Sequence, residues 1–244
     1  MSQRTPIASH APAPPSMAAV SRMGIFLGLD ASALAEVLAA ATLATAQAGE
    51  AYVCQGDPAH RFYLLVSGRV RLSQVTPEGQ QVVMRFIAPG EEFGIVAILG
   101  RLPYPVTAEA VEPAVALAWS GEAFNRLILR HPQIGLNGMA MLAERVREFQ
   151  DRLREAGTQR VERRVANGLL RLARQAGRSV AEGVLIDLPL SRQDLAEMTG
   201  TTLFTVSRTL AGWEERGIIS SARKRVTLLQ PHALVAVAED LPEG

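Results

Sequence analysis

The sequence contains a single cysteine, Cys54, and this scarcity excludes several kinds of site. One thiol cannot form a disulfide within the chain, and it cannot supply the four thiolates that hold an iron–sulfur cluster. The four histidines form no spaced set with cysteine or acidic residues, so the sequence predicts no zinc or other metal site.

Long apolar runs are also missing. No stretch approaches 18 apolar residues without a charge, so we expect no transmembrane helix. Residues 1–23 are rich in Pro, Ala and Ser and hold no apolar core of signal-peptide length, which is typical of a disordered tail. These absences together predict a cytoplasmic protein that does not contact the membrane.

The chain as a whole has little excess charge, with a formal net charge of +1. Its charges are nevertheless unevenly placed. Residues 160–230 contain eleven Arg and one Lys against seven acids, a net charge of +5, whereas residues 1–130 carry a net charge of −1. A basic C-terminal part suits the phosphates of nucleic acid, and a length of 244 residues favours two domains.

Within the basic part, residues 190–217 predict two helices joined by a tight turn. Ser191 is a favourable N-cap with an acid three residues later, and Gly200 can end the first helix in a left-handed conformation. Thr201 or Thr202 can cap the second helix, which has an apolar face at helical spacing. This layout indicates a helix-turn-helix, which places its second helix in the major groove of DNA.

The outward face of the second helix and the segment after it carry the residues that we expect to bind DNA. Arg208 can pair with a guanine, which discriminates by about 1–3 kcal/mol, and Phe204 can contact a thymine methyl group. After Gly217, two apolar runs around a cationic turn predict a wing that binds phosphates. A solvated helical hairpin is the alternative. The predicted DNA-binding residues are Ser191, Arg192, Thr201, Thr202, Leu203, Phe204, Thr205, Ser207, Arg208, Arg223, Lys224 and Arg225.

Between Glu50 and Trp119, short β-like runs alternate with Gly and Pro turns, which predicts a β-barrel or jelly roll. A short helix is expected before them over Ser32–Ala44. An enzyme on a similar β-fold would need clustered histidines and carboxylates on its strands, and these runs hold neither. We therefore expect no catalytic residues.

From about Pro132 the pattern becomes helical, and its apolar residues follow the alternating three- and four-residue spacing of a coiled coil. The other positions are charged, which favours a partner helix over packing against the β-domain. A homodimer would present two recognition helices about one DNA turn apart, so the operator should be an inverted repeat. A hinge is expected at Gly157, before a helix over Val161–Ala176. The predicted dimer interface consists of Met139, Leu142, Val146, Phe149, Leu153 and Ala156.

From about Gly24 to Leu229 the chain resembles the Crp/Fnr family of bacterial transcription regulators. The pattern GD…FYLLVSGRVRL…G…PGEEFG is similar to the family's cyclic-nucleotide-binding β-roll, and TTLFTVSR to its recognition helix, with Phe204 where a Glu is common. The resemblance implies an α+β fold, with DNA, a second copy of the chain and RNA polymerase as partners. Its parts would be a tail (1–23), a β-roll sensor domain (24–130), a dimerisation helix (131–157) and a winged helix-turn-helix domain (158–244).

The resemblance also implies where an effector would bind. Relatives that bind cyclic nucleotides place a Glu for the ribose after a Phe-Gly pair, and an Arg-Ser pair for the phosphate ten residues later. Here Ile95 replaces the Glu, and Tyr104 and Pro105 replace the Arg-Ser pair. We therefore expect that cyclic AMP does not bind, and keep a cyclic-nucleotide receptor as an alternative. The candidate effector pocket comprises Phe93, Gly94, Ile95, Tyr104, Pro105, Phe149 and Gln150.

The tract FGIVAILGRLPYPVTAEAV and the recognition helix look most like the nitric-oxide-responsive denitrification branch, the NnrR and Dnr types. That branch implies a nitrogen-oxide or redox signal, with haem as a candidate cofactor and a haem-based gas sensor as an alternative. His60, His131 and Cys54 are the candidate axial ligands, because haem iron needs such a donor. Each also has an ordinary interpretation, as a turn residue, a helix-start residue and a small strand residue.

Overall fold

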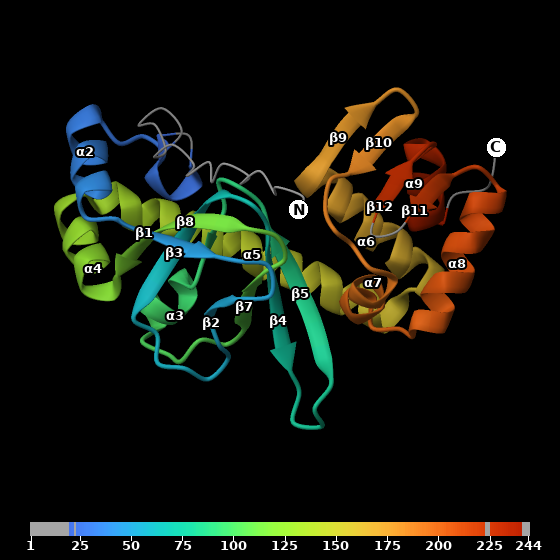
Figure 1. Ribbon diagram of the computed structural model, residues 1–244, viewed down its shortest axis with the longest axis horizontal. Coiled ribbons are helices and arrows are strands. Elements are labelled where there is room, and N and C mark those ends of the chain that lie inside the picture. The colour runs from blue at the N-terminus through green and yellow to red at the C-terminus, as the bar shows by residue number, and fades with distance from the viewer. Residues whose placement is uncertain (1–19, 22, 223–224, 241–244) are drawn as a thin grey trace, which may run out of the picture.

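The computed structural model describes residues 20–21, 23–222 and 225–240, and at 152, 155, 156 and 158 it describes the backbone alone. As the sequence predicts, the fold is α+β, with a β-rich N-terminal domain, a long helix and a C-terminal helix-turn-helix domain (Figure 1). Among the described residues, none of the helices combines the length and apolar character needed to cross a bilayer.

Two antiparallel four-stranded sheets form the β-roll. Its interior is packed with aromatic and small apolar side chains, including Tyr63, Phe93 and Ala108. The first sheet has the order β1 (Thr42–Ala46), β8 (Ala114–Ser120), β3 (Arg61–Ser67) and β6 (Glu92–Phe93). The second has the order β2 (Ala51–Val53), β7 (Thr107–Ala110), β4 (Val70–Val75) and β5 (Gln81–Ile87).

Four short helices accompany the roll in the described part of the chain: η1 (Gly24–Phe26), α2 (Ala31–Ala39), α3 (Ile95–Gly100) and α4 (Gly121–Arg130). Their apolar sides enclose a second core around Trp119, whose indole nitrogen donates a hydrogen bond of 2.8 Å to the carbonyl of Val37. The helix expected over Ser32–Ala44 is wrong at its C-terminal end. It ends at Ala39 because Thr42–Ala46 pair with β8 instead.

The C-terminal half begins with the long helix α5 (Pro132–Thr158), which continues through Gly157; the chain turns only at 159–160. The helix predicted over Val161–Ala176 is confirmed as α6. The rest of this half consists of β9 (Gly177–Val180), β10 (Gly183–Ile186), α7 (Arg192–Thr199), α8 (Leu203–Glu215), β11 (Ile219–Ala222), β12 (Arg225–Leu228) and α9 (Pro231–Glu239). Its sheet has the order β11-β12-β10-β9.

A β-bulge on β5 shapes the contact between the two domains. Ser73 on β4 lies opposite Val83, while Leu72 lies opposite Arg85, so the register of the ladder shifts by one residue at Met84. The extra residue turns Val83 and Phe86, three positions apart, to the same face of the sheet. Both side chains are buried in the core of the helix-turn-helix domain. The β-roll therefore packs against the helix-turn-helix domain through β5.

Candidate nucleic-acid interface

Local hydrogen bonds build the two helices of the helix-turn-helix. The Ser191 hydroxyl accepts a bond of 3.0 Å from the Asp194 amide, and the Asp194 carboxylate accepts one of 2.9 Å from the Ser191 amide. Gly200 ends α7 in the left-handed conformation, with φ of 62°. The Thr202 hydroxyl accepts from the amide of Thr205 at 3.2 Å and caps α8. The predicted caps are thus confirmed.

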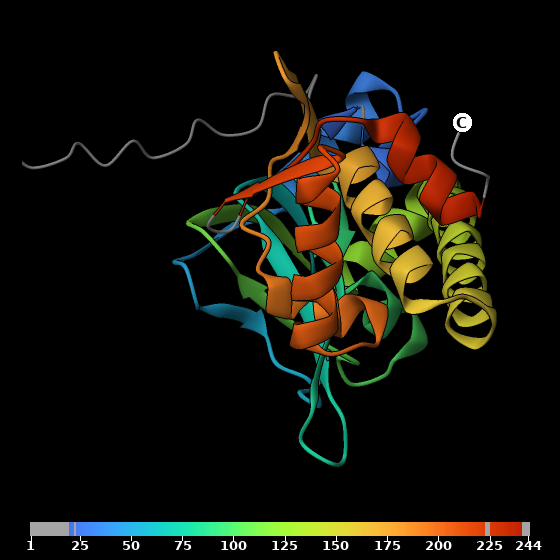
Figure 2. The same cartoon turned by 90° about the vertical axis from the view of Figure 1, so that its right-hand side faces the viewer.

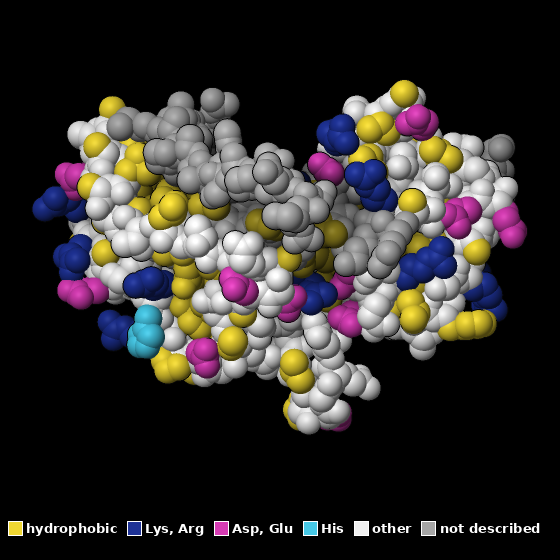
Figure 3. Space-filling view, viewed as in Figure 1, with side chains coloured by type: hydrophobic (Ala, Val, Ile, Leu, Met, Phe, Trp, Pro, Cys, Tyr) yellow, Lys and Arg dark blue, Asp and Glu magenta, His cyan; other side chains and the backbone are white. Residues whose placement is uncertain are grey.

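Helix α8 has one buried and one exposed face. Val206, Leu210 and Trp213 are buried, and the Trp213 indole donates to the Glu162 carboxylate at 3.1 Å, which joins α8 to α6. On the other face, Phe204 is 75% exposed. Figures 1 and 2 place α8 at the end of the molecule remote from the β-roll, and Figure 3 shows apolar and cationic side chains together over it. Arg208 and Leu203 are exposed there too, while Thr201, Thr205 and Ser207 are partly buried.

Arg164 on α6 holds the turn between the two helices, a role that was not predicted from the sequence. Its guanidinium donates to the carbonyls of Thr199 at 3.0 Å and Gly200 at 3.2 Å, and to that of Gln159 at 3.0 Å. These carbonyls end α7 or precede α6, so one side chain satisfies backbone groups that the helices leave unpaired. No local pattern marks this role, because its partners are 35 and 36 residues away.

The predicted wing is confirmed as β11 and β12, which pair in antiparallel register. Arg225 is exposed at the start of β12; the other two predicted cations of the tip, Arg223 and Lys224, lie outside the described residues. The Glu214 carboxylate accepts from the Ser221 amide at 2.8 Å and so anchors the wing to α8. Arg192 donates to the hydroxyl of Ser221 at 3.3 Å.

A groove of about 510 Å³ lies between the start of α7 and this wing. Arg192 and Arg225 line its walls together with Ser191 and Ser221. Cationic side chains next to the N-terminus of a helix attract phosphate. The fold therefore brings the phosphate-binding candidates of α7 and the wing to one surface.

Within the β-roll, the positions of the candidate effector pocket are filled. Ile95 is 3% exposed and Tyr104 is 5% exposed. The Tyr104 hydroxyl donates to the carbonyl of Arg61 at 2.6 Å and accepts from its amide at 3.1 Å, so it is engaged within the roll. Gly94 has a φ of 82°, and a Cβ there would lie 3.2 Å from the carbonyl oxygen of Arg61. No carboxylate or guanidinium stands at the two positions that receptors use.

Aromatic rings occupy the centre of the same region. Phe93 stacks on Tyr63 with ring centroids 4.9 Å apart, and Tyr52 packs edge-on against Phe93. Burial raises the pKa of Tyr52 to about 12, so its hydroxyl stays protonated. Of the remaining pocket candidates, Pro105 is exposed on the roll and Phe149 and Gln150 are exposed on α5.

The three candidate haem ligands are not enclosed in a pocket, as an axial ligand of haem would be. His60 is exposed, and Cys54 is exposed just after the end of β2. His131 lies between α4 and α5, where its ring nitrogen is 3.1 Å from the Glu36 carboxylate. A tyrosinate ligand at Tyr52 is opposed by its raised pKa. Within the described ranges, no group of three His, Cys, Asp or Glu residues is placed to hold a metal ion.

A stripe of large apolar side chains lies exposed along α5. It contains Met139, Val146, Phe149 and Leu153 of the predicted interface; Leu142 is partly buried, and of Ala156 only the backbone is described. The stripe extends further toward the N-terminus than the sequence indicated. There an apolar groove of about 550 Å³ is lined by Leu99, Leu129, Leu136 and Met139 among others.

Comparisons with known proteins agree with this architecture. Residues 44–131 match the model of the cyclic nucleotide-binding domain, and residues 163–237 match that of the Crp-like helix-turn-helix domain. The chain is 34% identical to the Cyclic AMP receptor protein of Thermus thermophilus, over 70% of this chain and 76% of that protein. It is 30% identical to the Global nitrogen regulator of Synechococcus elongatus, over 76% of this chain and 85% of that protein.

Among solved structures, FixK2 from Bradyrhizobium japonicum superposes with a TM-score of 0.71 at 27% identity. The superposition covers 84% of this chain and 98% of the FixK2 chain. The similarity therefore includes the roll, the long helix and the helix-turn-helix domain, and is not confined to one domain.

Proposed function

The chain belongs to the Crp/Fnr family of DNA-binding transcription regulators, and from this premise we propose that it acts as a homodimer on an inverted-repeat operator. The observation that carries the proposal is the exposed apolar stripe of α5, in a chain whose recognition helix is also exposed. Large apolar groups in a continuous stripe are stabilised by a partner surface. A second α5 offers a matching stripe, since a two-fold interface uses the same residues on both copies.

The recognition helix supplies the proposed sequence preference. Arg208 reads a guanine, Ser207 a base edge or phosphate, and Phe204 an apolar base edge. Arg192 and Arg225 bind phosphates beside the helix, and the tip cations Arg223 and Lys224 join them. At a promoter, the bound dimer would act through RNA polymerase.

The operator can be found without knowing the target genes. The wild-type chain is incubated with a random pool of double-stranded DNA, and the bound fraction is sequenced. We expect an inverted repeat with half-sites about one helical turn apart. A mobility shift with the selected site then measures the affinity. Selection of no sequence, or of a single unrepeated half-site, would contradict the proposal.

The proposed signal is not a cyclic nucleotide. Buried Ile95 and the internally bonded Tyr104 stand where a receptor would hold the ribose and the cyclic phosphate. The alternative, a cyclic-nucleotide receptor, is suggested by the name of the Thermus relative. Calorimetric titration with cyclic AMP and cyclic GMP separates the two. Heat of binding at micromolar ligand would favour the alternative.

We propose nitric oxide or a redox change as the signal, with control of denitrification genes as the role. The support is the resemblance of residues 93–111 and of the recognition helix to that branch, and the nitrogen-linked name of the Synechococcus relative. The operator affinity is measured without oxygen, with and without nitric oxide, and with and without added haem. A visible absorption spectrum of the same samples shows whether haem binds. Equal operator affinities under all conditions would refute this signal.

A further inference from the structure

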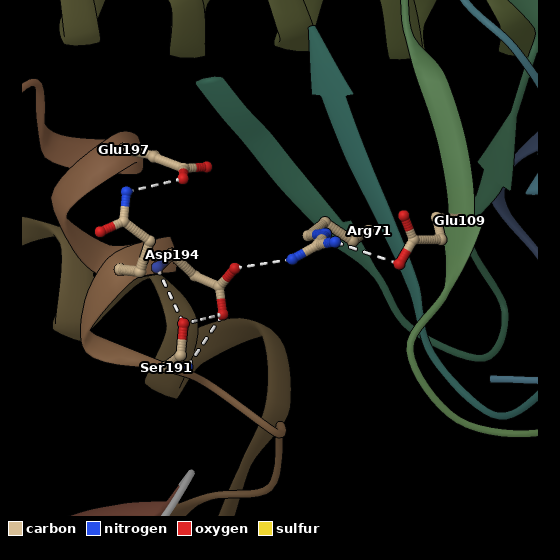
Figure 4. Close-up of polar contacts among 6 residues, drawn as sticks. Arg71, Glu109, Ser191, Asp194 and Glu197 are labelled. Atoms are coloured by element: carbon tan, nitrogen blue, oxygen red, sulfur yellow. Dashed lines mark hydrogen bonds and ion pairs between the residues drawn. The ribbon is translucent and has the colours of Figure 1, made fainter. Parts of the chain in front are cut away.

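Arg71 on β4 lies at the centre of the contact between the β-roll and the DNA-binding domain (Figure 4). One guanidinium nitrogen donates to the Asp194 carboxylate of α7 at 2.9 Å. Another donates to the Glu109 carboxylate of β7 at 3.0 Å. A single side chain thus joins the β-roll to α7, the first helix of the helix-turn-helix.

The sheet register aims Arg71 at α7. Strand β4 runs between β7 and β5, and Arg71 lies opposite Glu109 on one side and Phe86 on the other. Directly opposed residues of neighbouring strands share a face, so these three side chains form a row. Phe86 is buried in the core of the DNA-binding domain, which fixes the direction in which the row points. Glu109 holds the Arg71 guanidinium in place from its own sheet.

The two oxygens of the Asp194 carboxylate accept hydrogen bonds from different partners, which fixes the orientation of Arg71 relative to α7. One oxygen accepts from the amide and hydroxyl of Ser191 and completes the cap of α7, while the other accepts from Arg71. Burial by itself lowers the pKa of Arg71, but the hydrogen bond to Asp194 and the charge of Glu109 outweigh it, so the pKa is raised. Arg71 therefore remains charged and held by two carboxylates. Because burial of such a pair costs desolvation, its main effect is to fix orientation.

The β-roll is held on its other side to the proposed dimerisation helix. Glu92 is buried and paired with Arg145 of α5. The preceding residue, Glu91, accepts from Gln175 of α6 at 2.8 Å and pairs with Arg85 of β5 at 2.6 Å. Glu92 thereby fixes the roll to α5, and Glu91 fixes it to α6 of the helix-turn-helix domain. The angle between the helix-turn-helix domain and α5 depends on both attachments.

We propose that Arg71 is a positioning residue for DNA recognition: it holds the helix-turn-helix at the angle to α5 at which a dimer matches the spacing of its two half-sites. This inference rests on the proposed homodimer and inverted repeat. Arg71 itself is remote from the recognition helix, because α8 lies at the end of the molecule away from the roll (Figures 1 and 2). Loss of the Arg71 side chain should change the spacing between the two helix-turn-helix domains of a dimer and leave each domain folded.

The test compares Arg71→Met with wild type on three DNA probes: the selected inverted repeat, the same repeat with its spacer one base pair longer or shorter, and a single half-site. Met keeps the apolar stem and removes both charged hydrogen bonds. We expect about tenfold weaker binding to the full repeat, since such bonds are among the stronger ones in proteins. Discrimination between spacers should fall as well, while half-site affinity stays unchanged.

Matched variants separate positioning from a general loss of structure. Arg61→Met removes an exposed cation of the same roll and should behave as wild type. Glu109→Gln weakens one of the two partners of Arg71 and should give a smaller loss. Arg71→Lys keeps the charge but cannot fork to both carboxylates, so it should rescue only part of the affinity. Unchanged spacing selectivity in Arg71→Met, or an equal loss on half-site and full site, would overturn the inference.

Hydrogen exchange without DNA keeps the inference testable if wild type selects no operator, an outcome that contradicts only the proposed function. In Arg71→Met, amides of β5, which packs against the helix-turn-helix domain, should exchange faster, while α7, α8 and the buried strand β3 of the roll keep their protection. Arg61→Met should leave the exchange of all four elements unchanged. Equal exchange in wild type and Arg71→Met would mean that Arg71 does not hold the two domains together, and would overturn the inference independently of any operator.

Discussion

Individual side chains on the DNA-binding surface differ in what they can distinguish. A guanidinium in the major groove can pair with one base, whereas a guanidinium on the wing meets a phosphate that every sequence presents. Arg208 on α8 is of the first kind and Arg225 on β12 of the second. Their substitution should therefore change two separate quantities.

Arg208→Ala should lose about 1–3 kcal/mol of preference for the selected operator over a version mutated at the guanine. Arg225→Ala should weaken binding to both DNAs alike and lower the slope of affinity against salt by about one. Competition binding at several salt concentrations measures both effects. If both variants lose affinity for the two DNAs in equal proportion, the assignment of roles is wrong.

Phe204 is the residue at which this recognition helix departs from the family pattern. Phe204→Glu should change the selected half-site at one base pair, because a carboxylate can accept a hydrogen bond from a cytosine amino group. The side chain is 75% exposed, so the melting temperature should stay within a few degrees of wild type. Repeated selection from the random pool shows the new half-site. An unchanged consensus would mean that Phe204 does not contact a base.

At the scale of elements, the exposed stripe of α5 is the feature with the clearest consequence. Phe149→Arg should convert the dimer to monomers, because two charges would face each other in an apolar seam. Leu43→Arg is the matched control, since Leu43 on β1 is 57% exposed and Phe149 on α5 is 58% exposed. Analytical ultracentrifugation measures the oligomeric state. A Phe149→Arg variant that remains dimeric would place the interface elsewhere.

The elements that could be predicted from sequence are those determined by neighbouring residues. The caps at Ser191 and Thr202 and the left-handed Gly200 depend on residues within one turn, so their residue types suffice. The same holds for α6, whose predicted bounds are those of the structure. Strands β3, β4 and β5 likewise lie in the region between Glu50 and Trp119 where short strands are predicted, because turn residues separate them.

Other elements depend on contacts between distant parts of the chain. Strand β9 is a four-residue strand that pairs only with β10 in the described structure, and nothing in Gly177–Val180 marks it as extended. Helices α3 and α4 adjoin β-like runs and were not predicted from the sequence. Arg164 and Arg71 were missed for the same reason, because their partners are up to 123 residues away.

At the scale of the whole molecule, Phe86 couples the stability of the two domains. Its backbone belongs to strand β5 of the roll, and its side chain is buried in the core of the helix-turn-helix domain. Phe86→Ala should cost about 3–5 kcal/mol through lost burial and the cavity left behind. Calorimetric unfolding should then change from one transition to two, because the domains no longer unfold together.

Phe93→Ala provides the comparison, since Phe93 is equally buried but lies inside the roll. It should lower the melting temperature by a similar amount and leave a single transition. Two transitions in wild type, or one in Phe86→Ala, would show that the packing of Phe86 does not couple the domains.

The Asp194 carboxylate, whose two oxygens bind different groups, also limits how freely helix-turn-helix domains can be exchanged between such proteins. One oxygen serves the helix to which it belongs, and the other serves the β-roll. A helix-turn-helix domain taken from another protein can cap its first helix with several residue types. The Arg71 guanidinium on β4 of this chain, however, requires an acid at the position of Asp194. Exchange of the two domains therefore requires an acid at this position as well as the apolar packing of Phe86, and a chimera without the acid would leave Arg71 without its partner on α7.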